Sequence, residues 1–174
     1  MKKIFFVLTI MMMPVLLAAQ SAFDKFDGKD GVTAVIVNKK MFELMGNVKL
    51  DAKDKEAQQY LSLVKKLDNL KVFTTTDAKA VADMRATVSS YLKKYPLEEL
   101  MRVNDSGRTI KIYVKSGARS SQVLELLMFI DGGKDDTVLM SLTGNFDLSE
   151  LSVLTDKMNL PGGTELRKAS KKSK

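Results

Sequence analysis

The sequence contains no cysteine, no histidine and no tryptophan in 174 residues. Without cysteine there is neither a disulfide nor a thiol nucleophile, so the hydrophobic core must stabilise the fold. Without histidine, the Ser-His-Asp and Cys-His catalytic arrangements and the usual zinc sites are excluded. We therefore expect a non-enzymatic protein that holds no cofactor and no metal.

Long apolar runs are also scarce, and the clearest one lies at the start of the chain. Lys2 and Lys3 precede the apolar run 4–17, and Ala18-Ala19 supplies the small residues of a cleavage site. This run is too short for a comfortable membrane span. We predict that residues 1–19 are a signal peptide cleaved near Ala19; an uncleaved anchor helix is the alternative. The product is expected to be exported, periplasmic or extracellular, with no stable membrane anchor.

Positive charge is concentrated near the two ends of the chain. The formal net charge of +7 falls to +5 when Lys2 and Lys3 are removed. Residues 165–174 hold five cations and one glutamate, a net +4, which leaves about +1 for the rest and argues against a nucleic-acid partner. The five cations are Arg167, Lys168, Lys171, Lys172 and Lys174. We expect residues 161–174 to be a disordered basic tail, either without a partner or in weak contact with an anionic surface.

The remaining chain is long enough for one domain. We expect a lead-in loop over residues 20–31 and a single α+β domain over residues 32–160. The predicted elements, in order, are a strand at 32–37, a helical turn at 39–45, a helix at 51–68, a strand at 70–75, a helix from 76 or 77 to 95, a strand at 97–103, three strands between 108 and 142, and a short helix at 148–158. A helical crossover predicts that the first two strands are parallel. A four-strand meander completes one mixed sheet with helices mainly on one face.

The stretch from Arg108 to Leu142 organises this fold. Its first and third strands alternate in polarity, whereas the middle strand is apolar except for Glu125 and must be covered on both faces. One face is expected to carry Ile110, Ile112, Val114, Leu124, Leu126, Met128, Ile130, Val138, Met140 and Leu142. The other is a candidate partner face made of Tyr113, Val123, Leu127, Phe129 and Leu139. The simpler interpretation is that the C-terminal helix or the Phe23–Phe26 segment covers that second face.

Serine and lysine leave one catalytic alternative open. Ser62 and Lys65, like Ser90 and Lys93, match the S-x-x-K spacing of penicillin-binding enzymes, and Lys115-Ser116-Gly117 is similar to their K-T-G element. The S-D-N element of those enzymes is missing, and both serines lie on predicted helices. A small hydrolase that uses carboxylates or a Ser-Lys pair is therefore the alternative to a binding protein.

Acidic residues cluster in two predicted turns, with Asp27 and Asp30 in one and Asp131, Asp135 and Asp136 in the other. Clustered carboxylates are potential Ca²⁺ ligands, but neither stretch matches the twelve-residue calcium loop. Aspartate and glycine also stabilise tight reversals of the chain, which we favour as the explanation.

The chain resembles a family through several stretches: VTAVIVNKKMFELMG near the start, EELMRVNDSG before IKIYVK, and LELLMFID followed by VLMSLTGNFDLSEL. These are similar to the small exported envelope proteins of Bacteroidota catalogued as domain of unknown function 4252. The resemblance covers about residues 32–154 and implies no catalytic residues; it suggests at most an association with envelope stress or signalling. We expect a binding module that meets a protein or peptide partner through a sheet face or edge.

Export is directly testable. If residues 1–19 are a signal peptide, the intact mass of the protein isolated from its native host will correspond to a chain that begins near Gln20. An intact mass that includes Met1 would contradict the prediction.

Overall fold

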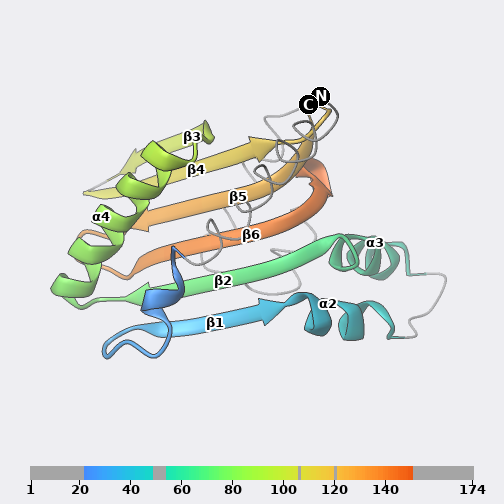
Figure 1. Ribbon diagram of the computed structural model, residues 1–174, viewed down its shortest axis with the longest axis horizontal. Coiled ribbons are helices and arrows are strands. Elements are labelled where there is room, and N and C mark those ends of the chain that lie inside the picture. Colours follow the sequence, from blue (N-terminus) through green and yellow to red (C-terminus); the bar gives the residue numbers. More distant parts are fainter. Residues whose placement is uncertain (1–21, 49–53, 106, 120, 151–174) are drawn as a thin grey trace, which may run out of the picture.

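The computed structural model describes residues 22–48, 54–105, 107–119 and 121–150. The predicted signal peptide, the basic tail, the start of the helix predicted at 51–68 and most of the helix predicted at 148–158 lie outside the described residues. The described part contains one sheet, three α-helices and two short 3₁₀ helices (Figure 1).

All six strands of the described chain form one antiparallel sheet in the order β1-β2-β6-β5-β4-β3. The strands are β1 (Thr33–Asn38), β2 (Leu67–Thr75), β3 (Glu98–Asp105), β4 (Arg108–Ser116), β5 (Gln122–Asp131) and β6 (Thr137–Asp147). The predicted meander is confirmed as β3 to β6, each strand pairing with the next along the chain. The mixed sheet is not, because β1 and β2 are antiparallel.

The parallel start was wrong because two helices, not one, connect β1 to β2. The first, α2 (Lys39–Gly46), begins directly after β1, and the side chain of Asn38 accepts a hydrogen bond from the Met41 amide at 3.0 Å. The second, α3 (Lys55–Val64), is capped by Asp54, which accepts from the Ala57 amide at 3.0 Å. A pair of helices returns the chain to the end of the sheet it left, so β2 runs back along β1 (Figure 1).

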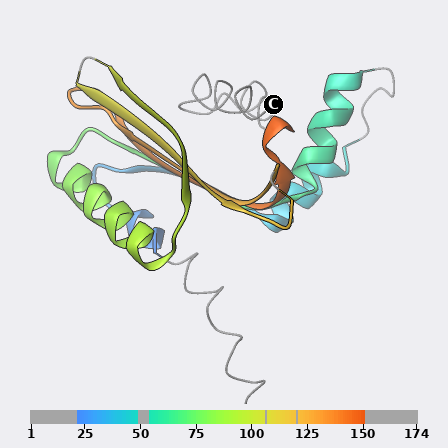
Figure 2. The ribbon, with the colours of Figure 1, turned by 90° about the horizontal axis from the view of Figure 1, so that it is seen from above.

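Helices lie against both faces of the sheet, which corrects the expectation that they lie mainly on one. Helix α4 (Ala78–Lys94) and the 3₁₀ helix η2 (Asp24–Phe26) lie on one face, and α2 and α3 lie at the far end of the molecule, toward the other (Figure 2). The α4-side core includes Met84, Val88, Leu127, Phe129 and Leu139. The opposite core includes Phe42, Leu63, Leu126, Met128 and Met140, and continues into the 3₁₀ helix η3 (Leu148–Glu150) through Leu148.

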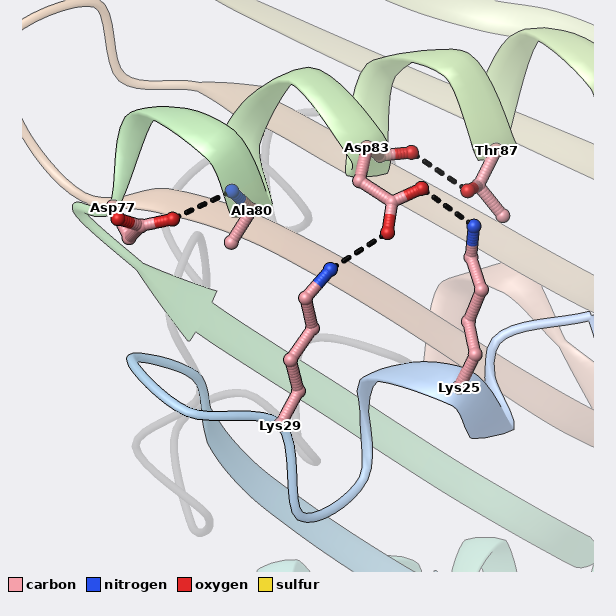
Figure 3. Close-up of polar contacts among 6 residues, drawn as sticks. All are labelled: Lys25, Lys29, Asp77, Ala80, Asp83 and Thr87. Atoms are coloured by element: carbon pink, nitrogen blue, oxygen red, sulfur yellow. Dashed lines mark hydrogen bonds and ion pairs between the residues drawn. The ribbon is translucent and has the colours of Figure 1, made fainter.

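The segment expected as a lead-in loop packs into the α4-side core. Phe23 and Phe26 are 1% and 0% exposed, and the ring of Phe23 packs against that of Tyr91 in a tilted arrangement with a centroid distance of 4.8 Å. Asp83 of α4 binds this segment from above, accepting from Lys25 at 2.6 Å and Lys29 at 2.7 Å (Figure 3). These ammonium groups hold the pKa of Asp83 below its usual range. The packed domain therefore begins before β1.

A β-bulge changes which side chains share a face at the start of β5. The pairing of β5 with β6 is irregular between Val123 and Glu125, so the two-residue alternation is broken there. Val123 consequently lies in the core opposite α4, although it was expected on the other face with Leu127. Leu124, expected in a core, is 37% exposed.

Burial predicts at which positions shortening a side chain to alanine destabilises the fold. Leu126 is 0% exposed in the middle of the sheet, so Leu126→Ala should lower the free energy of unfolding by about 2–5 kcal/mol. Lys111→Ala, on a half-buried position of neighbouring β4, is the control and should change it far less. Urea denaturation measures both. Equal losses for the two variants would show that the assignment of β5 to the sheet centre is wrong.

Candidate functional site: a polar pocket and a bare sheet edge

A pocket of about 340 Å³ opens on the α4 face of the sheet beside Tyr91. Its walls come from β2, β4, β5 and β6 and from the C-terminal half of α4. The lining residues are Asp68, Asn69, Lys71, Tyr91, Lys115, Leu124, Glu125, Ser141, Thr143 and Gly144. The strand register explains how they meet, because Lys71 pairs with Ser141 across β2 and β6, while Glu125 lies between Lys115 and Thr143.

Glu125 is 8% exposed at the floor of this pocket. The Tyr91 hydroxyl donates a hydrogen bond to Glu125 Oε1 at 2.6 Å. Burial raises the pKa of Glu125 above its usual range, and the bond from Tyr91 and the charge of Lys115 offset only part of this effect. Burial and the neighbouring carboxylate likewise raise the pKa of Tyr91. The pair is thus a polar contact kept inside the α4-side core.

Lys71 is the second buried charge of the pocket, and it too is 8% exposed. Its ammonium group forms an ion pair with Asp24 of η2. Because a buried ammonium is strongly disfavoured without a partner, this contact ties the N-terminal segment to β2. On the adjacent side of the pocket, Asp68 accepts from Lys39 at 2.9 Å.

A second surface is formed by β1 and the helix that follows it. Strand β1 is at the end of the sheet and pairs only with β2 among the described strands. Val35 and Ile36, whose side chains alternate between the two faces, are 49% and 41% exposed. Met41 and Leu44 on α2 are 52% and 56% exposed. Residues 33–38 contain no charged side chain.

The opposite edge strand, β3, carries charged side chains, which β1 lacks. Strand β3 carries Glu98, Glu99, Arg102 and Asp105. Arg102 donates to both carboxylate oxygens of Glu99, at 2.9 and 2.6 Å. Charged side chains on an edge strand oppose pairing with another chain. Among the described strands the two edges therefore differ, because β3 carries charged side chains and β1 carries none.

The five residues of the candidate partner face are all buried. Tyr113, Leu127, Phe129 and Leu139 lie in the α4-side core, where Met84, Val88 and Tyr91 of α4 pack together with Phe23 and Phe26. Val123 is in the opposite core. In this structure the chain itself covers the proposed docking face.

The Ser-Lys candidates are not brought together. Ser62 is exposed on α3, whereas Ser90 is exposed on α4, on the other face of the sheet. Lys115 does line the pocket, but Ser116 and Gly117 are not among its lining residues.

The acidic turn candidates take part in ordinary contacts. Asp131 makes two hydrogen bonds with Arg85, at 2.6 and 2.7 Å, and the Asp135 amide closes a turn onto the Gly132 carbonyl at 3.0 Å. Among the residues that the structure describes, no group of three carboxylates is arranged to hold a metal. None of the helices in that part of the chain is long and apolar enough to cross a membrane.

Sequence reasoning missed the pocket, although two signals mark it. Lys71 interrupts the apolar run of β2, and Glu125 interrupts that of β5. A charge inside a run that is otherwise buried requires either a partner or a solvent-accessible hollow. What the sequence does not show is that β2 and β5 are separated by β6 alone, which places both charges at one hollow.

The molecule is thus an α+β domain built on a single antiparallel sheet, with an uncharged edge strand and a polar pocket. The chain belongs to the family described as Domain of unknown function (DUF4252), whose model matches residues 26–154. Comparison with curated proteins finds no match, and comparison with solved structures finds none either.

The buried carboxyl group predicts a pH dependence of stability. The pKa of Glu125 in the folded protein lies above the ordinary value of 4.5. At pH values between the pKa of Glu125 in the unfolded chain and its pKa in the folded protein, Glu125 binds a proton in the folded state only. The stability that this proton contributes is therefore fully present below the unfolded pKa and is lost as pH rises through the folded pKa. Glu125→Gln should lack this loss, and the variant should gain stability relative to the wild type as pH rises.

Urea unfolding at a series of pH values measures the effect. Glu98→Gln on the exposed edge strand β3 is the matched control, and its curve should run parallel to that of the wild type. A Glu125→Gln curve that also runs parallel would show that this carboxyl group titrates as it does in the unfolded chain.

Proposed function

We propose that this protein is an exported, non-enzymatic envelope protein of Bacteroidota that binds a partner protein by strand addition at β1. The observation that carries the proposal is the uncharged, half-exposed edge formed by Val35 and Ile36. An extended segment that pairs with such an edge gains main-chain hydrogen bonds along its length. The proposed signal peptide supports export, and the family resemblance supports an envelope role connected with stress or signalling.

The chemistry of the edge defines the partner segment. Strand β1 offers Val35 to one face and Ile36 to the other, so a partner strand needs apolar side chains on both of its faces at that position. Met41 and Leu44 extend the apolar surface onto α2. Because no charge in residues 33–38 is available to pair with, we expect an uncharged, β-branched stretch of the partner to dock there.

The pocket favours a second candidate, the small hydrolase. It collects Asp68, Lys71, Lys115 and Glu125, and several titratable groups in one pocket are a general feature of active sites. However, Glu125 is held by Tyr91 and Lys71 by Asp24, so both buried groups are engaged in contacts inside the protein. We therefore prefer the binding function.

Site-specific photo-crosslinking in intact cells tests the edge. A photo-reactive residue at position 36 should give a discrete adduct, whereas one at position 102 on the charged edge should not. Val35→Lys, combined with the probe at position 36, should reduce the adduct several-fold, since a charge on an edge strand opposes pairing.

The identity of the crosslinked peptide decides between the partners. An uncharged, apolar stretch of another envelope protein would support the proposal. An adduct of twice the chain mass would show that the partner is a second copy of this chain and not a different protein. Equal crosslinking from positions 36 and 102 would refute strand addition at β1.

A further inference from the structure

A second pocket, of about 520 Å³, lies between α4 and the strands β4 and β5, and we call it the Lys111 pocket. Its volume is within the range of small-molecule sites, roughly 300–1,000 Å³. One wall is a face of α4 between Arg85 and Lys93, on which the lining residues recur every three or four positions. The opposite wall belongs to the sheet and consists of Lys111, Tyr113, Phe129 and Asp131.

The floor of the Lys111 pocket is the apolar margin of the α4-side core. Val88, Tyr113 and Phe129 belong to that core and each still exposes 5–8% of its surface. Leu92 packs against the same core and is only partly buried. A ligand with an apolar body would remove the remaining surface of these side chains from water, which is favourable.

The charges around the Lys111 pocket are predominantly positive. Three cations, Arg85, Lys93 and Lys111, face one carboxylate, Asp131, a net +2. Arg85 and Asp131 neutralise each other through two hydrogen bonds at 2.6 and 2.7 Å. Among the residues that the structure describes, no carboxylate forms an ion pair with Lys93 or Lys111.

The carboxylates that interact with Lys111 over a longer range are already bound to arginines. Its charge helps to lower the pKa of both Asp131 and Glu99, but Asp131 is held by Arg85 and Glu99 by Arg102. Arg102 of β3 is also the cross-strand partner of Lys111. Because like charges in directly opposite positions are unfavourable, an anion beside Lys111 would reduce this repulsion.

We infer that the Lys111 pocket binds a small organic anion, namely a carboxylate with an apolar body. The ammonium groups of Lys93 and Lys111 attract the carboxylate, and the body packs over Val88, Leu92 and Phe129. A cation of the same shape is repelled by the net positive charge, and a small inorganic anion leaves the apolar floor in contact with water. This binding involves no covalent step and goes beyond strand addition, since no residue of β1 lines the pocket.

Titration calorimetry of the purified protein tests the inference with four probes: octanoate, 1-octanol, octylammonium and acetate. Octanoate, which combines the negative charge with the apolar chain, should bind saturably in the millimolar range or below. It should bind at least tenfold more tightly than each of the other three. Added salt should weaken its binding, because charges at the surface are screened.

Substitutions on the pocket wall locate the site. Lys93→Gln and Lys111→Gln should each weaken octanoate binding about twofold to fivefold, as loss of a solvent-exposed ion pair does. Lys79→Gln, which removes the same charge from α4 outside the pocket, is the matched control and should leave the affinity unchanged.

A bulky side chain gives an independent test of the location. Ser89→Trp, at an exposed position of the pocket wall, should block octanoate binding, whereas Ser90→Trp at the next exposed position of α4 should not. Thermal melting confirms that each variant is folded.

The inference is overturned if octanoate does not bind, or if 1-octanol, octylammonium or acetate binds as tightly. It is also overturned if the folded lysine variants or Ser89→Trp bind octanoate like the wild type. Ser89→Trp should leave crosslinking at position 36 intact, so a failure of this inference is distinguishable from a failure of strand addition at β1.

Discussion

The rest of the structure depends on one constraint, the need to cover a sheet whose central strands are apolar on both faces. Along β5, Leu126 and Met128 point to one core while Leu127 and Phe129 point to the other, and all four are at most 6% exposed. A strand of this kind has no face to offer to solvent. Helix α4 and the N-terminal phenylalanines meet this requirement on one side, and α2 and α3 contribute on the other.

The sequence predicts the meander well because its signals are local. Alternation, turn residues and one apolar run locate β3 to β6 without knowledge of the rest of the fold. The direction of β1 relative to β2 depends instead on how many helices connect the two strands. Helix α2 has only eight residues, and when residues 39–45 are counted as a turn the predicted pairing becomes parallel instead of antiparallel. The bulge between Val123 and Glu125 cannot be predicted from the sequence either. In a strand that is apolar on both faces, one extra residue produces no detectable break in the polar–apolar alternation.

The surfaces with functional interest are partly predictable, for different physical reasons. The lack of charge in residues 33–38 can be read directly, but that β1 is an edge strand follows only from the strand order. The charges of Lys71 and Glu125 stand out in apolar runs, yet their meeting depends on β6 lying between β2 and β5. Composition therefore identifies the unusual residues, and topology decides what they form together.

The edge and the pocket are neighbours on the sheet without being one site. Ile36 of β1 pairs with Lys71 of β2, and Lys71 pairs with Ser141 of β6. Ile36 is therefore the cross-strand neighbour of a residue that lines the pocket. The same Lys71 forms an ion pair with Asp24, which holds the N-terminal segment against β2. Val35, in contrast, is directed to the opposite face, where it neighbours Val72. A partner strand on β1 would thus touch both faces, and its contacts with Ala34, Ile36 and Asn38 would lie on the side where the pocket opens.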